Sequence, residues 1–404
     1  MNKVIFFFIL LCSVHFFGLH FRLGEDAYDL IDFTYFGLAF LLLGKLLAGR
    51  VKVRLPASEF VFGKAIFLLF CALIISSLSG YYYHQQNPLL TLLAMRYFLY
   101  FLVFFCLIVL GVSKEYLVKV VIVFAFFYMA VFSLQLILFP TAIVPLGRIE
   151  GFDRGFLRLR LEGVGFITLT AFYALNQFLK SKQTKYILLY LLCFTFVFIL
   201  GFRTLLATFL VSSLLLAVAY EKFAVKRFMV LCSCGLLVLG LLLIPDIQNY
   251  LLAMLDTTTA QVEQGDNYIR VRTFDFYFNQ VNVDFGSLLL GNGQPFYGTP
   301  YGNYVFDYGV LKNGFIMADL GLLGFMFNYG VLGGIAFLNI YRIAIFKKLP
   351  KDSIYLNIYF FYMVVSSITT AEIFRAGIFG VQMIGLYLIA ITCFEQSRKH
   401  ISTK

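Results

Sequence analysis

The 404-residue sequence contains no tryptophan, and only 13% of its residues are charged, about half the usual share. This deficit accompanies 61% hydrophobic residues, where a soluble domain has roughly 45–50%. These proportions exclude a soluble enzyme, a disordered chain and a disulfide scaffold. Because tryptophan is absent, the 26 tyrosines must supply the aromatic belt at the membrane–water interfaces. The composition is that of a polytopic inner-membrane protein.

Motifs for metals, nucleotides and disulfides are also missing. All seven cysteines lie inside apolar runs, which indicates small core side chains. The histidines His15, His20, His84 and His400 form no cluster with Cys, Asp or Glu at metal-ligand spacing. No Gly-x-x-x-x-Gly-Lys-Ser/Thr loop for nucleotide phosphates occurs. We therefore expect no metal site and no cofactor.

Apolar runs long enough to cross a bilayer, about 20 residues each, predict an all-α integral membrane protein with twelve spans. We expect five helices in 1–138, a core in 139–345, and two helices with a cytoplasmic tail in 346–404. The core includes two outer loops, 139–162 and 246–312, and the second is long enough to be functional. The expected spans are 4–21, 30–49, 60–82, 90–112, 117–138, 163–180, 186–202, 204–220, 228–245, 313–343, 354–371 and 376–394.

Lysine and arginine in short loops predict the orientation, because cytoplasmic loops carry more of both. With both termini in the cytoplasm, 21 of the 32 basic residues lie inside, among them Lys45, Lys114, Lys180 and Lys351. The net charge of +11 is then a topological signal. We expect contact with membrane lipids and no nucleic-acid partner.

The basic residues on the outer side differ in type from those inside. Ten of these eleven are arginine, although lysine outnumbers arginine 17 to 15 over the chain. Topology gives no reason for the split, whereas a planar guanidinium with five donors suits phosphate and carboxylate. We expect an anionic ligand at the outer face. The eleven are Arg22, Arg96, Arg148, Arg154, Arg158, Arg160, Arg203, Arg270, Arg272, Lys312 and Arg375.

Seven of the ten outer arginines lie in three segments. In the first loop, Arg158 and Arg160 alternate with leucines, which predicts an extended segment with both guanidinium groups on one face; a solvated charged surface is the alternative. Arg203 occupies the turn of a hydrophobic hairpin, where it is either functional or snorkels to the headgroups. Arg270 and Arg272 alternate in the same way.

Two further features of the second loop suit a sugar-containing ligand. The glycines of Gly291-Asn292-Gly293 permit a close backbone approach to a ligand. The segment 297–308 is rich in glycine and tyrosine, a composition that suits stacking on sugar rings. Chemistry on an anionic, lipid-borne substrate at the outer face is therefore the expectation.

Four short motifs follow one another along the chain. They are Arg154 with Gly165 after ten residues, Gly201-Phe202-Arg203-Thr204, Arg270 and Arg272 ahead of Leu290-Gly291-Asn292-Gly293, and Ala318-Asp319-Leu320-Gly321-Leu322-Leu323-Gly324. With these motifs, the chain resembles bacterial O-antigen polymerases, in the superfamily that also contains the O-antigen ligases. It departs from the family at two places. Lys312-Asn313 stands where ligases have a His-Asn pair, and a second Arg-x10-Gly is missing because Val281 and Val283 occupy its glycine position.

The resemblance implies a GT-C-like architecture and metal-independent polymerisation of polyprenyl-diphosphate-linked oligosaccharides, for O-antigen or capsule. Arginine would stabilise the diphosphate leaving group, and a chain-length regulator protein is a candidate partner. The expected catalytic residues are Arg203, Arg154, Arg270, Glu162 and Asp319. The expected substrate-binding residues are Arg148, Arg158, Arg160, Arg272, Lys312, Arg375, Gly291 and Gly293.

Two other functions remain open. A ligase or related surface-polysaccharide transferase would move the finished chain to another acceptor, and the missing His-Asn pair counts against it. A flippase of the same lipid-linked oligosaccharide would require polar residues through the bilayer, whereas here they gather at one face.

The topology makes the first testable prediction. Reporter fusions at Lys182 and Gln261 should give opposite signals, because the arrangement with 21 basic residues inside and 11 outside places these positions on opposite sides. Alkaline phosphatase and fluorescent-protein fusions measure this directly. A cytoplasmic signal from both would remove the basis for function in the second loop.

Overall fold

The computed structural model describes residues 2–23, 26–48, 61–144, 159, 161–220 and 263–402. Regular structure in this part of the chain is helical, as expected for an all-α protein. In the first half the helices are α1 (Asn2–Ser13), η1 (His15–Leu23), α2 (Asp26–Leu47), α3 (Val61–His84), α4 (Pro88–Ala94), η3 (Arg96–Leu102), α5 (Val103–Leu110), α6 (Lys114–Leu138), α7 (Val164–Ser181), α8 (Thr184–Ile199) and α9 (Arg203–Tyr220).

The second half contains several short helices followed by three longer ones. The outer lobe, defined as residues 263–320, holds α12 (Ile269–Asp275), α13 (Phe285–Leu290), α14 (Pro300–Asn303), η8 (Met317–Leu320) and the π-helices η6 (Phe276–Val281) and η7 (Tyr304–Lys312). After it come α15 (Leu322–Phe346), α16 (Ile354–Ser366), η10 (Glu372–Phe374), η11 (Ala376–Ile378) and α17 (Phe379–Ser402).

Six helices in the described residues are long and apolar enough to cross a membrane, which makes this a multi-pass membrane protein. They are Asp29–Leu47, Val61–His84, Lys114–Leu138, Arg203–Tyr220, Leu322–Phe346 and Phe379–Arg398. A seventh is possible where Pro88–Ala94 and Arg96–Leu110 pass together, although they are bent by 61°. Helices α1, α7, α8 and α16 occupy further expected spans but do not meet both criteria. The expected span 228–245 lies outside the described residues.

In the second half of the chain, the structure differs from the expectation at the start of one span and in the second loop. The span expected at 313–343 begins only at Leu322, because Gly314 and Gly321 adopt positive φ angles of 70° and 57° that a helix does not tolerate. The second outer loop is not a continuous loop, since its described part, 263–312, forms short helices. Hydropathy could not show this, because these helices are too short and too polar to stand out.

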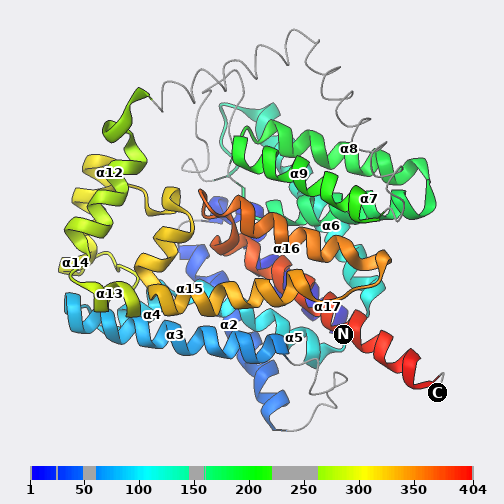
Figure 1. Ribbon diagram of the computed structural model, residues 1–404, viewed down its shortest axis with the longest axis horizontal. Coiled ribbons are helices and arrows are strands. Elements are labelled where there is room, and N and C mark those ends of the chain that lie inside the picture. Colours follow the sequence, from blue (N-terminus) through cyan, green and yellow to red (C-terminus); the bar gives the residue numbers. More distant parts are fainter. Residues whose placement is uncertain are drawn as a thin grey trace.

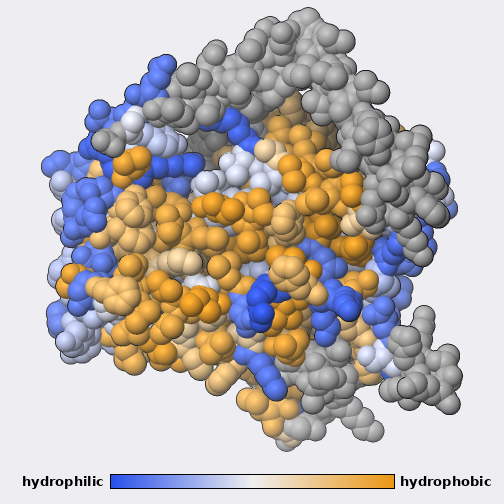
Figure 2. Space-filling model, in the orientation of Figure 1, coloured by the Kyte–Doolittle hydropathy of each residue, from blue (hydrophilic) through white to orange (hydrophobic). Residues whose placement is uncertain are grey.

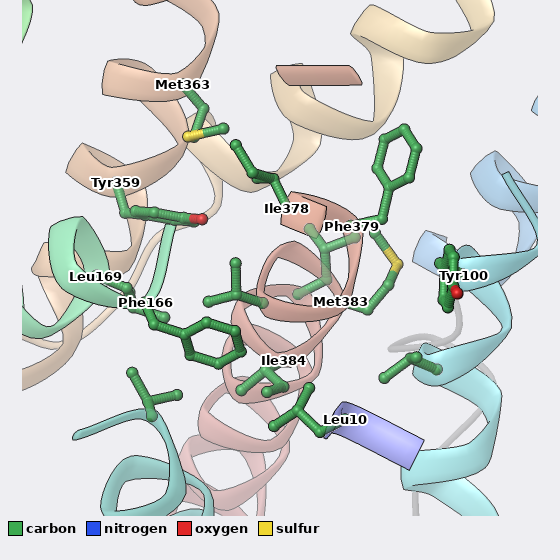
Figure 3. Packing of buried hydrophobic residues seen from close by; sticks show 14 of the residues in the cluster. Leu10, Tyr100, Phe166, Leu169, Tyr359, Met363, Ile378, Phe379, Met383 and Ile384 are labelled. Carbon is green, nitrogen blue, oxygen red and sulfur yellow. The ribbon is translucent and has the colours of Figure 1, made fainter. Parts of the chain in front are cut away.

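Helix α17 forms the centre of the bundle, with 78% of its most apolar stretch buried. Side chains of other elements, among them Leu10, Tyr100, Phe166 and Tyr359, surround it (Figure 3). Small residues allow the close approach: a Cβ on Gly165 of α7 would lie 2.6 Å from Cγ1 of Val381. Phenylalanine and leucine are frequent among the buried residues, and apolar helices pack directly against one another.

The two ends of the bundle differ in character (Figure 1). At one end, Lys180 pairs with Asp352 at 2.6 Å, and Lys114 donates to Ser353 at 3.1 Å and Thr392 at 3.0 Å. The outer-lobe helices α12, α13 and α14 lie at the other end, where polar side chains edge the apolar surface (Figure 2). The connections expected in the cytoplasm therefore meet at one end of the molecule.

A break in α15 attaches the outer lobe to the bundle. Gly330 has non-helical angles (φ 76°, ψ 164°), which frees the carbonyls of Phe327 and Asn328 from the helix. These carbonyls accept hydrogen bonds from the backbone N–H groups of Asn292 at 3.0 Å and Gly293 at 2.9 Å. The Gly291–Gly293 turn is thus held by backbone hydrogen bonds, which require an approach that side chains would block.

Replacing Gly291 should destabilise the protein more than replacing another glycine of similar φ. Gly291 (φ 100°) would place a Cβ 2.6 Å from the Asn328 carbonyl oxygen, whereas Gly298 (φ 91°) has no heavy atom within 4 Å of that position. Both alanine variants carry a backbone strain of about 1–3 kcal/mol, but only Gly291→Ala adds the clash. Thermal unfolding in nanodiscs measures the difference. Equal melting temperatures would mean that the turn does not hold the lobe.

Candidate functional site

A cavity of about 240 Å³ lies where the outer lobe meets the bundle. Its walls come from the lobe, from the start of α15 and from the segment before α17, so it forms only when the chain is folded. The lining residues are Tyr97, Gln294, Met317, Ala318, Gly324, Phe325, Asn328, Tyr329, Ala371, Phe374 and Arg375.

A chain of hydrogen bonds runs along one wall of this cavity. The hydroxyls of Tyr97 and Tyr329 are hydrogen-bonded, and Tyr329 donates to Oε1 of Gln294 at 2.7 Å. Asn328 donates to the same oxygen through Nδ2 at 2.7 Å. Its other amide atom, Oδ1, is buried without a hydrogen-bond partner among the described residues. A buried acceptor left unpaired costs free energy, and a ligand hydroxyl in the cavity would satisfy it.

Arg375 supplies the positive charge of the cavity. Its Nη1 donates to Oε1 of Glu372 at 2.9 Å, and the side chain is 19% exposed. Burial by itself lowers the pKa of the guanidinium, but the neighbouring Glu372 carboxylate raises it more, so the net pKa lies above the usual value. Arg375 thus stays charged, and donors other than Nη1 remain for a ligand.

Glu162 lies in a buried polar cluster that the sequence did not predict. Its carboxylate is hydrogen-bonded to Nδ1 of His15, whose Nε2 lies 3.0 Å from Oδ1 of Asp32. Tyr100 donates to the same oxygen of Asp32, and Nε of Arg96 lies 3.1 Å from Oδ2. In the sequence, His15 lies inside the apolar span expected at 4–21. An ionisable side chain inside a span is a functional candidate by default, and this was the one sign of the cluster in the sequence.

The geometry of this cluster is that of an ion-pair network. The two ring nitrogens of His15 point away from each other, so the two carboxylates cannot share one ion with the histidine. No group of three His, Cys, Asp or Glu side chains suited to a metal occurs in the part of the chain that the structure describes.

The outer-lobe arginines do not follow the extended pattern predicted for them. Arg270 and Arg272 lie on helix α12, where residues two apart point to different faces. The guanidinium of Arg272 lies 5.4 Å from the ring centroid of Phe315, and Lys312 lies over Tyr308 at 5.3 Å. The alternation of Arg270 and Arg272 therefore does not mark an extended segment, and a seven-residue helix is too short for its period to show in the sequence.

The structure separates several of the predicted site residues. Arg375 lines the cavity, whereas Arg272 lines a second hollow, so these two arginines do not converge on one cavity. Arg203 begins α9 and Asp319 is half-buried in η8, one residue beyond Ala318 of the cavity wall. Gly291 and Gly293 support the wall through the turn that carries Gln294. Arg148, Arg154, Arg158 and Arg160 lie outside the described residues.

Comparison with known proteins adds no family assignment. No family model, no curated protein and no solved structure matches the chain. The resemblance to O-antigen polymerases therefore depends on the order and spacing of the four short motifs.

The buried cluster makes a prediction with an internal control. Asp32 and Asp29 both pair with Arg96, but their side chains are 4% and 61% exposed. Asp32→Ala leaves His15, Tyr100 and Arg96 without their shared acceptor, and breaking a buried pair costs about 3–5 kcal/mol. Asp29→Ala removes an exposed pair, at about 1 kcal/mol or less. Unfolding in mixed micelles measures both, and equal losses would contradict a stabilising role for the cluster.

Proposed function

We propose that this protein polymerises polyprenyl-diphosphate-linked oligosaccharide repeat units at the outer face of the inner membrane. The observation that carries the proposal is the Arg375 cavity. It combines one partly buried guanidinium, amide groups and tyrosine hydroxyls at the end of the bundle opposite Lys114, Lys180 and Lys351. A diphosphate and a sugar require such donors and acceptors, and a lipid-borne substrate reaches a cavity at the membrane boundary.

In the proposed reaction, a hydroxyl of one oligosaccharide attacks the anomeric carbon of the other. The new carbon–oxygen bond forms as the bond to the diphosphate breaks, and polyprenyl diphosphate leaves. Arg375, with Arg203 and Arg270 as further candidates, would stabilise the negative charge that develops on the leaving oxygen. No metal is required for this role.

The hydroxyl proton goes to a carboxylate or to the leaving diphosphate itself. The sequence leaves four carboxylates as candidate bases, Glu162, Asp275, Asp319 and Glu372. Glu162 is engaged by His15 inside a buried cluster, and Glu372 accepts from Arg375. Asp319 is half-buried beside the cavity wall and makes no ion pair with any described residue. Asp319 is therefore the better-placed base, and Glu162 is better placed to hold the helices around the site.

The alternatives are a ligase or related transferase and a flippase. A ligase would use the same leaving group, so the cavity fits it equally, and the absence of the His-Asn pair at Lys312-Asn313 is the argument against it. A flippase would need polar groups from end to end of the bundle. Glu162 and Arg375 instead lie shortly before α7 and α17, at the ends far from Lys180 and Thr392.

The guanidinium geometry can be tested without removing charge. Arg375→Lys and Arg203→Lys keep the charge but lose the planar fork, so polymer yield should fall by about 100-fold, as when one transition-state donor is lost. Arg342→Lys is the control, because Arg342 is exposed and donates only to Asn339 among the described residues. The assay follows chain length on gels after complementing a deletion strain.

The deletion strain itself separates the three activities. Loss of a polymerase leaves single repeat units on the cell surface, loss of a ligase leaves long chains on the lipid carrier, and loss of a flippase leaves single repeats on the cytoplasmic side. Long lipid-linked chains in the deletion strain would refute polymerisation.

A further inference from the structure

A second hollow, of about 370 Å³, lies within the outer lobe and is separate from the Arg375 cavity. Its volume lies within the range of small-molecule sites. The polar side chains around it come from three helices and the segment after them. They are Arg272 and Asp275 on α12, Gln280 on η6, Tyr308 on η7, and Asn313 beyond η7, with Phe315 as an apolar floor.

Four of these side chains end in planar groups that bind two neighbouring hydroxyls at once. Asp275 is held in place by Asn279 at 2.8 Å and Gln280 at 2.9 Å, one on each carboxylate oxygen. A carboxylate has about four acceptor positions, so each oxygen can accept a further hydrogen bond. The amide hydrogen bonds lower the pKa of Asp275, which therefore remains an acceptor at neutral pH.

Arg272 provides the matching donors. Its guanidinium lies against the ring of Phe315, which fixes the plane while leaving the edge available. It forms no ion pair within the described residues. The lining itself carries one cation and one carboxylate, and the carboxylate repels phosphate. A hollow of this kind favours an uncharged, hydroxyl-rich ligand over a diphosphate.

Both π-helices of the outer lobe contribute to this hollow. Gln280 belongs to η6 and Tyr308 to η7. A π-helix is rare and is frequently found at functional sites. Two π-helices border this hollow, which indicates that the placement of its lining side chains is more important than a regular helix geometry there.

The hollow and the cavity share one stretch of chain. Asn313 and Phe315 line the hollow, and Met317 and Ala318 line the cavity. The first and last of these are five positions apart, a distance of at most about 18 Å even if the chain is fully extended. An extended oligosaccharide can therefore occupy the hollow while one of its ends reaches the cavity.

We propose that the outer-lobe hollow is a saccharide subsite, which binds an uncharged sugar residue of the polymer chain whose end reacts at the Arg375 cavity. The statement that the chain end reacts at the Arg375 cavity rests on the proposed function, whereas the binding of a sugar at the hollow does not. Sugar recognition is assigned to Arg272, Asp275, Gln280 and Asn313. Arg272 then donates to sugar hydroxyls and does not bind the diphosphate.

The test uses the full-length protein in nanodiscs and a probe without lipid or diphosphate. The probe is oligosaccharide released from the native host's surface polysaccharide by mild acid, and inorganic pyrophosphate is the competing probe. Asp275→Ala and Gln280→Ala should weaken oligosaccharide binding about tenfold or more, because hydrogen bonds to a charged acceptor are lost. Asp307→Asn changes an exposed carboxylate on η7 outside the hollow and should bind as the wild type does.

Saturation-transfer NMR reports which outcome holds. Unchanged binding in Asp275→Ala and Gln280→Ala would overturn the inference, as would displacement of the oligosaccharide by pyrophosphate. In polymerisation assays the same variants should shorten the chains while retaining the first coupling, whereas Arg375→Lys should slow every coupling. A wild-type protein that binds the oligosaccharide at the hollow but forms no polymer would refute the proposed function and leave the subsite standing.

Discussion

The backbone contact between the Gly291–Gly293 turn and the break in α15 is the constraint on which the candidate sites depend. Two carbonyls, of Phe327 and Asn328, leave the helix and bind the turn, and Ser76 of α3 donates to the second at 2.6 Å. Three segments distant in sequence are thereby joined at one point. Gln294 directly follows the turn, so its position in the cavity is a consequence of this contact.

The bundle separates two uses of positive charge. Lysines at one end pair with carboxylates, hydroxyls and a backbone carbonyl of neighbouring helices, which joins the ends of α6, α7, α9, α16 and α17. Arginines at the other end lie in polar surroundings built for planar donors, as Arg375 beside Glu372 and Arg96 between Asp29 and Asp32 show. The difference follows from chemistry, because an ammonium is a point charge and a guanidinium is a fork.

Hydropathy predicted the long helices well, because a bilayer imposes one length and one composition on each span. It misplaced the start of α15, since Gly314 and Gly321 are apolar by composition but break a helix by conformation. The His15–Asp32–Glu162 cluster was not predictable, because His15 and Glu162 are 147 positions apart and meet only after packing. Arg375 could be predicted as a site residue because it is an arginine on the side expected to be outside. Its ion pair with Glu372 and the amide groups near it in the cavity are apparent only in the folded structure.

The stretch Asn313–Ala318, which borders both the hollow and the cavity, has a kinetic consequence under the proposed function. A chain held at the hollow keeps its end near the reacting centre, so each new coupling becomes effectively intramolecular. For a short tether the effective concentration reaches the millimolar range, far above that of a scarce carrier lipid. Elongation would then proceed by many successive additions to one chain before release, and the strength of sugar binding at the hollow would set the average length of the product.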